Sequence, residues 1–144
     1  MIIIKPSKQN MLDRLAVVSA VDAGTRRILT NFGRFVRRAA RFSMRRRKDA
    51  SQPGTPPSVH TGLLRQLILY AYDPSSRSVV IGPRLLRRGS IAARTTEEGG
   101  VVERKKRRGG VATLKYPARP YMRPAFRQEL QGKLAKQLEG FVKP

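Results

Sequence analysis

The sequence contains no cysteine and a single histidine, His60. Disulfides, thiolate nucleophiles and cysteine-ligated zinc are therefore excluded, and one histidine leaves too little material for a metal cluster. A reducing compartment is compatible with such a chain. No run of 18 or more apolar residues occurs, and the apolar start MIIIK is too short for a signal-peptide core. We therefore expect a soluble protein without a membrane partner, metal or cofactor.

Acidic residues are also scarce. The 144 residues include 9 Asp and Glu against 31 Lys and Arg, which gives a net charge of +22. A surface this cationic repels itself unless a polyanion or an acidic partner lies close. The length indicates one domain with a modest core. Nucleic acid, an acidic protein ring and anionic lipid are all compatible with the charge alone.

Apolar residues between Ser7 and Arg47 predict a long N-terminal helix over residues 7–47. They recur at steps of three, four or seven, which places them on one helix face with most arginines elsewhere. A helix of this length would span about 60 Å, more than a compact domain of this size needs. We expect it to extend beyond its own core, although Gly24 and Gly33 could divide or bend it.

A connector over residues 48–60 and a β-hairpin are expected next. The Pro-Gly and Pro-Pro steps of the connector cannot continue a helix. Thr61 is a candidate N-cap for a short helical turn, and QLILYAY then predicts a strand buried on both faces. DPSSR is a turn by composition, and SVVIGP predicts the returning strand.

The second half is expected to hold a basic insertion, a third strand and a closing helix. Residues 84–110 are polar, basic and punctuated by glycine, which predicts a mobile loop or a long hairpin arm. Residues 61–83 and 111–117 would form the sheet. Apolar steps of three or four predict a C-terminal helix over 123–141, with Pro124 at its first position. The predicted fold is a single α+β domain, with two helices packed on a small, mainly antiparallel sheet.

Neither candidate for enzyme chemistry is favoured by the sequence. Ser58 and His60 are too local to form a catalytic triad, because triads assemble across a fold. Glu97, Glu98 and Glu103 could hold Mg²⁺, but ion pairing with nearby arginines is the favoured interpretation. We therefore predict no catalytic and no metal-binding residue, and a protein that is not an enzyme.

Two basic runs are candidates for contact with DNA or with an acidic partner. They comprise Arg45, Arg46, Arg47 and Lys48, and Arg104, Lys105, Lys106, Arg107 and Arg108. Contact with phosphates and simple solvation are both compatible with such runs. A Cys-His finger is impossible, and no helix-turn-helix or RNP-type pattern is present. Any nucleic-acid contact should therefore be to the backbone and independent of sequence.

The segment YPARPYMRPAF should run extended before the last helix. A residue before proline is pushed out of the helical region, and this segment contains three prolines after its first tyrosine. Tyr121 and Met122 could project as anchors for a partner. Packing of both side chains at the start of the helix is the interpretation that the physical pattern favours.

The stretches PGTPPSVHTGLLR, VVIGP, EEGG and ARPYMRPAF, in this order, resemble the tailed-bacteriophage virion morphogenesis family. Its members are the small neck proteins that complete tails or join heads to tails. The resemblance covers about residues 34 to 130. The family's acidic-glycine element usually carries an aromatic residue, whereas this chain has TTEEGG. The motif positions assigned a structural or interface role are His60, Thr61, Gly62, Leu64, Arg65, Gly82, Gly99, Gly100, Arg119, Pro120, Tyr121 and Met122.

The resemblance implies a structural protein that forms a ring at the head–tail junction of the virion and is made in the host bacterial cytoplasm. Its expected partners are itself in six or twelve copies, and adjacent neck, portal-side or tail-tube and terminator proteins. Packaged double-stranded DNA would be contacted nonspecifically, and His60 would help to fix the bend after the long helix. The alternative is a free, sequence-nonspecific nucleic-acid-binding protein. A nuclease is the least favoured class.

Overall fold

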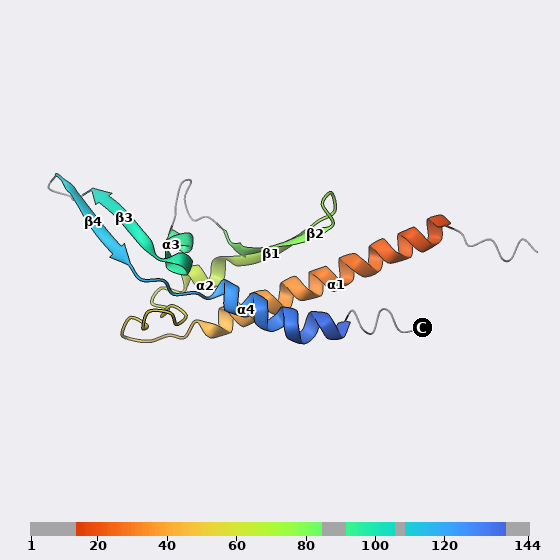
Figure 1. Cartoon of the computed structure of the whole chain (residues 1–144), viewed down its shortest axis with the longest axis horizontal. Helices are drawn as coiled ribbons and strands as arrows, with labels where there is room; N and C mark the ends of the chain where they lie inside the picture. The colour runs from red at the N-terminus through yellow and green to blue at the C-terminus, as the bar shows by residue number, and fades with distance from the viewer. Residues whose placement is uncertain (1–13, 85–91, 106–108, 138–144) are drawn as a thin grey trace, which may run out of the picture.

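The computed structural model describes residues 14–84, 92–105 and 109–137 (Figure 1). Its elements in chain order are α1 (Arg14–Ser43), α2 (Leu63–Leu67), β1 (Ile68–Asp73), β2 (Ser78–Pro83), α3 (Ala92–Glu98), β3 (Gly100–Lys105), β4 (Val111–Tyr116), α4 (Met122–Glu129) and the π-helical turn η2 (Leu130–Leu134). The predicted α+β class is confirmed. Helix α1 packs against the β1–β2 hairpin and against α4. The β3–β4 hairpin projects from the end of the body opposite the start of α1 (Figure 1).

Helix α1 is continuous over its 30 residues, so no glycine divides it. It ends at Ser43, before the predicted end at residue 47, and the predicted residues 7–13 lie outside the described part. The hydroxyl of Ser43 donates to the carbonyl of Ala40 at 2.8 Å, and Met44 is fully buried just beyond. The chain therefore leaves the helix and enters the core at Met44. The basic run at 45–48 follows the helix instead of forming its last turn.

The core is built on the second half of α1. Phe32, Val36, Ala40 and Met44 are buried at steps of four, which stack on one helix face. Ile68, Tyr121 and Ala125 from the hairpin and α4 complete the cluster. The rings of Phe32 and Phe126 meet edge to face, with centroids 5.3 Å apart. The spacing predicted an apolar face through Phe32, Phe35, Ala39 and Phe42. Of these, Phe32 is buried, Ala39 packs partly buried against the core, and Phe42 is 63 % exposed. The buried face is therefore turned by about one residue from the predicted one.

Strands β1 and β2 form the predicted antiparallel hairpin. Its turn is fixed by Asp73, whose carboxylate accepts bonds from the backbone N–H and hydroxyl of Ser75 and from the hydroxyl of Ser76. The hydroxyls of Ser75 and Ser76 lower the pKa of Asp73 to about 2. The prediction that β1 is buried on both faces is wrong, because only Ile68 is buried and its neighbour Leu69 is exposed.

The predicted single sheet is also wrong. Strand β4 pairs with β3 instead of joining the first hairpin, so the described chain contains two separate two-stranded sheets. Much of the predicted insertion at 84–110 is ordered as α3 and β3, and residues 85–91 and 106–108 lie outside the described part. Positive φ angles at Gly109 and Gly110 suit the turn into β4. Of the two alternatives for the insertion, strands β3 and β4 agree with the hairpin arm.

Helix α4 begins at Met122, so Pro124 stands at its third position and not at the predicted first one. Proline is tolerated there because the first backbone N–H groups of a helix have no intrahelical acceptor. The π-helical turn η2 continues the helix, and helical structure is described as far as residue 137. The predicted residues 138–141 lie outside the described part.

Gly33 brings α1 into direct contact with the first hairpin. A Cβ atom at this position would lie 2.8 Å from Cγ2 of Val79 and 2.9 Å from Cδ2 of Tyr70. We expect Gly33→Ala to lower the free energy of unfolding by about 1–2 kcal/mol, because crowding outweighs the better helix propensity of alanine. Urea unfolding followed by circular dichroism measures the change. Gly132→Ala is the matched control, since no atom lies within 4 Å of its added Cβ; equal stability of the two variants would contradict the packing argument.

Within the described residues, no helix combines the length and the apolar content needed to cross a bilayer.

Candidate functional site

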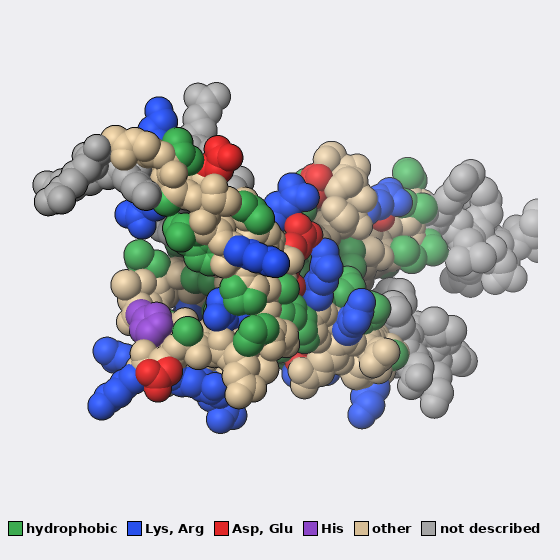
Figure 2. All heavy atoms as spheres, turned by 60° about the vertical axis from the view of Figure 1, so that its left-hand side comes forward, with side chains coloured by type: hydrophobic (Ala, Val, Ile, Leu, Met, Phe, Trp, Pro, Cys, Tyr) green, Lys and Arg blue, Asp and Glu red, His purple; other side chains and the backbone are tan. Residues whose placement is uncertain are grey.

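The first basic run lies on an exposed stretch directly after α1. The carbonyl of Arg45 accepts a hydrogen bond from the N–H of Val59 at 3.0 Å, and Arg46 forms an isolated β-bridge with the same residue. These contacts fold the connector back on itself and bring exposed His60 beside the run, where its side chain is the purple group in Figure 2. An open hollow of about 420 Å³ results, lined by Arg46, Arg47, Lys48, Val59 and His60.

The second basic run lies on the projecting hairpin. Arg104 and Lys105 are exposed at the end of β3, and the remaining three residues, Lys106, Arg107 and Arg108, lie outside the described part. No hydrogen bond or ion pair among the described residues joins this run to residues 45–48. The described part of one run therefore follows α1, and that of the other lies on the projecting β3–β4 hairpin (Figure 1).

The Ala-Arg-Pro-aromatic motif ties three segments together. Nε of Arg119 donates to the carbonyl of Ser51 at 3.0 Å, and its backbone N–H donates to the carbonyl of Thr96 at 2.8 Å. The N–H of Gly54 donates to the carbonyl of Ala118 at 2.8 Å. With the partly buried Pro120, this motif connects the connector, α3 and the start of α4. Its described contacts are structural.

Tyr121 packs inside the protein. Its side chain is 1 % exposed in the core, and Met122 is partly buried against that core. Burial, together with the smaller effect of the nearby Glu97 carboxylate, raises the pKa of Tyr121 to about 12. Of the two interpretations of this motif, packing at the start of the helix agrees with these contacts.

Glu97 caps α4 from a distant part of the chain, which the sequence interpretation missed. Its carboxylate accepts the backbone N–H groups of Tyr121 at 2.8 Å, Met122 at 3.0 Å and Arg123 at 2.9 Å. A carboxylate at a helix N-terminus satisfies orphan donors and complements the helix dipole. The sequence signal was the acidic pair before Gly99, but nothing in the sequence shows which helix it caps.

The predicted pairing of acids with arginines is confirmed for Glu98. Its carboxylate binds Arg94 and Arg123, each at 2.9 Å. The hydrogen bond with Arg94 lowers the pKa of Glu98 and raises that of the Arg94 guanidinium. Glu103 has no ion pair among the described residues. No group of three or more described histidine, aspartate and glutamate residues is placed to hold a metal.

Gly62 occupies the N-cap position of α2, so the expected cap at Thr61 is wrong. Gly62 has a φ of 81°, and the hydroxyl of Thr61 only accepts a long 3.5 Å bond from the N–H of Leu63. Leu64 packs against the core. The turn needs a residue that accepts a left-handed backbone, which explains glycine at this motif position.

The motif glycines between α3 and β3 are explained by backbone conformation and by close packing. Gly99 has a φ of 74°, and a Cβ there would lie 2.8 Å from the backbone nitrogen of Ala118. Gly100, with a φ of 143°, then starts β3. Gly82 stands opposite Leu69 in the first hairpin, and nothing in the structure explains a glycine there.

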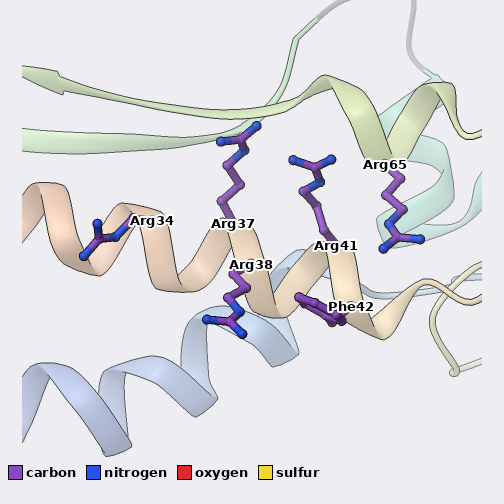
Figure 3. A pocket seen from close by; sticks show the side chains of 6 residues that line it. All are labelled: Arg34, Arg37, Arg38, Arg41, Phe42 and Arg65. Carbon is purple, nitrogen blue, oxygen red and sulfur yellow. The ribbon is translucent and has the colours of Figure 1, made fainter.

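Arg65 belongs to an arginine-lined hollow between α1 and α2 that the sequence interpretation did not assemble. We name this hollow of about 260 Å³ the arginine pocket; it is lined by Arg34, Arg37, Arg38, Arg41, Phe42 and Arg65 (Figure 3). The arginines of α1 were visible as a helically spaced set outside the apolar stripe. Their meeting with Arg65 depends on the path of the connector, which the spacing does not reveal.

Comparisons with protein-family models, curated proteins and solved structures found no match to this chain.

Proposed function

We propose that this chain is a structural virion protein of the phage neck, which forms a ring that completes the tail or joins head to tail around the DNA channel. The motif resemblance supplies the family. The observation that supports an assembling protein is the apolar surface that the described residues leave exposed near the start of α1. This end of the helix projects from the body in Figure 1. Leu15 is 82 % exposed, and Val18 and Val21 are each 47 % exposed.

The apolar stripe of α1 continues past the point where its own core ends. Val18, Val21 and Ile28 lie in the row that leads to Phe32, the first buried apolar residue on this helix. A surface helix gains most of its stability by packing an amphipathic face, so an apolar face left in water calls for a partner. A neighbouring copy or an adjacent neck component would cover it.

A second partly uncovered apolar surface lies beside α4. An open hollow of about 330 Å³ is lined by Val79, Ile81, Met122, Arg123, Phe126 and Arg127. Two such surfaces on one small chain suit a subunit with neighbours on more than one side, as a ring requires. The basic runs at 45–48 and 104–108 remain the proposed contacts with DNA or with acidic neighbouring proteins.

The second candidate function is a free, sequence-nonspecific nucleic-acid-binding protein. The charge of +22 favours it as much as it favours a neck protein. The apolar stripe of α1 distinguishes the two, because coating DNA does not require it. A neck protein should enter a fixed ring with other virion components, whereas a free binder should coat DNA alone.

Complementation of a phage lacking this gene tests the role of the stripe. We expect the double variant Val18→Asp and Val21→Asp to yield few infectious particles, because burying two unpaired carboxylates costs several kcal/mol, about 2 or more for each. The matched control is Ser19→Asp and Ala23→Asp, which adds the same charge to exposed positions on the other side of α1. Wild-type titres with the valine variant would contradict an assembly role for this surface.

A further inference from the structure

The arginine pocket places guanidinium groups from two elements around one space. Arg37 and Arg41 extend from α1 towards β1 and α2, and Arg65 extends from α2 towards α1 (Figure 3). Arg34 and Arg38 lie further along and around α1. The α1 arginines recur at steps of three and four, so the helix presents them on adjoining faces. The pocket is therefore a product of helix geometry and of the connector that returns α2 to α1.

Some of these side chains are held in place, and others are free to bind. Nε of Arg37 donates to the carbonyl of Ile68 at 2.9 Å, and the guanidinium of Arg38 lies 5.5 Å from the ring centroid of Phe42. Arg41 and Arg65 are partly buried, yet the side chain of neither forms a hydrogen bond or ion pair with the described residues. Their donors therefore face the pocket without a protein acceptor.

The charge of the pocket is uncompensated by its own lining. None of the lining residues is acidic, and the described ion pairs of the chain all involve other residues. Clustered like charges repel, and partial burial weakens their hydration. An anion in the pocket would relieve both effects. A guanidinium matches a phosphate with two parallel hydrogen bonds, which favours phosphate oxygens as the acceptors.

We propose that the arginine pocket binds phosphate groups of a nucleic-acid backbone, chiefly through Arg41 and Arg65. One small anion cannot neutralise five arginines, whereas a polymer of phosphates can. The basic run at 45–48 continues directly from this end of α1 and lines the next hollow, so the basic surface extends past a single site. The inference rests on the nucleic-acid contact in the proposed function, but it does not depend on the ring.

The test is binding of the purified full chain to a short mixed-sequence DNA duplex, measured by fluorescence anisotropy over a series of salt concentrations. We expect Arg41→Ala with Arg65→Ala to weaken binding roughly tenfold for each arginine. The slope of log K against log salt should become shallower by about two, because two phosphate contacts are lost. Arg41→Lys with Arg65→Lys should keep the slope and weaken binding less, since lysine keeps the charge without the paired donors.

The control variant is Lys115→Ala with Lys136→Ala, which removes the same charge from exposed positions outside the pocket. Thermal melts of all variants establish that they are folded. Equal weakening by the pocket and control variants would overturn the proposal, because it would mean that only net charge matters. Polyglutamate binding as tightly as the duplex, with the same loss in the pocket variant, would overturn the nucleic-acid assignment in favour of an acidic protein.

The pocket and the proposed neck function can fail separately. If the pocket variants lose duplex binding as expected while phage lacking the gene form normal particles, phosphate binding by the pocket is supported and the neck function is contradicted. If the gene proves essential for joining heads to tails while the pocket variants bind the duplex like the control, the pocket assignment fails alone.

Discussion

Replacing Glu97 by alanine is expected to lower the free energy of unfolding by about 2–4 kcal/mol, because hydrogen bonds to a charged acceptor are worth about 1.5–3 kcal/mol each and are not additive. Three backbone N–H groups at the start of α4 would lose their carboxylate acceptor. The side chain of Tyr121, the N-cap residue of α4, makes no capping hydrogen bond that could take the place of this carboxylate. The variant should also loosen α3, which this carboxylate ties to α4. Urea unfolding by circular dichroism measures the effect.

Two further variants separate the cap from a general loss of acidic charge. Glu97→Gln keeps one acceptor oxygen and should fall between the wild type and Glu97→Ala. Glu103→Ala removes the same charge from exposed β3, where the described residues give it no ion pair, and should change stability by less than about 0.5 kcal/mol. A Glu97→Ala protein as stable as Glu103→Ala would show that the cap contributes little.

Alkaline pH is expected to destabilise the fold through Tyr121. Burial raises the pKa of this tyrosine to about 12, whereas an unfolded tyrosine loses its proton near pH 10. Between these values the unfolded state binds fewer protons than the native state, so stability falls as the pH rises. The contribution is fully present below pH 10 and falls by about 1.4 kcal/mol per pH unit, or about 2–3 kcal/mol in all by pH 12.

Tyr121→Phe isolates this effect from other groups that titrate at high pH. The variant keeps most of the buried ring and lacks the ionisable hydroxyl, so its stability should fall less steeply between pH 10 and 12. Tyr116→Phe, at an exposed position on β4, is the control and should follow the wild type. Parallel pH profiles for the wild type and Tyr121→Phe, measured by urea unfolding at each pH, would rule out a buried neutral phenol as the cause.

The helices could be predicted from the sequence because their patterns are local. The apolar spacing predicted a helix here, and Phe32 on its expected apolar face is buried; the other buried residues, Val36 and Ala40, each lie one position after the expected Phe35 and Ala39. The end of the helix was placed too late, because the basic run that follows it is compatible with a last turn. Burial of Met44 and the bridge between Arg46 and Val59 decide that the chain leaves the helix, and both are tertiary contacts.

The pairing of strands could not be predicted from local patterns. VATLKY was correctly predicted as a strand, but its partner depends on the positive φ angles that Gly109 and Gly110 supply at the turn before it. Strand β3 itself carries Glu103, Arg104 and Lys105, and its burial is slight. A strand this polar gives no apolar alternation, so the insertion was expected as a basic loop or arm.

The candidate site was only partly predictable for a related reason. Basic runs are visible in a sequence, and the structure leaves their described members exposed as expected. The arginine pocket needs Arg65 to meet Arg41 across a connector of irregular structure, and the cap needs Glu97 to reach a helix 24 residues or more away. The spacing of residues in the sequence carries no information about such long-range contacts.

Electron microscopy of lysates from the parent phage or prophage with this gene disrupted tests the proposed neck function most directly. A protein that completes the tail or joins head to tail should be dispensable for making both parts. We expect DNA-filled heads to accumulate beside unattached tails, and the wild-type gene to restore whole particles. Normal, infectious particles in the disrupted lysate would contradict the neck function and make the free nucleic-acid-binding protein the leading function.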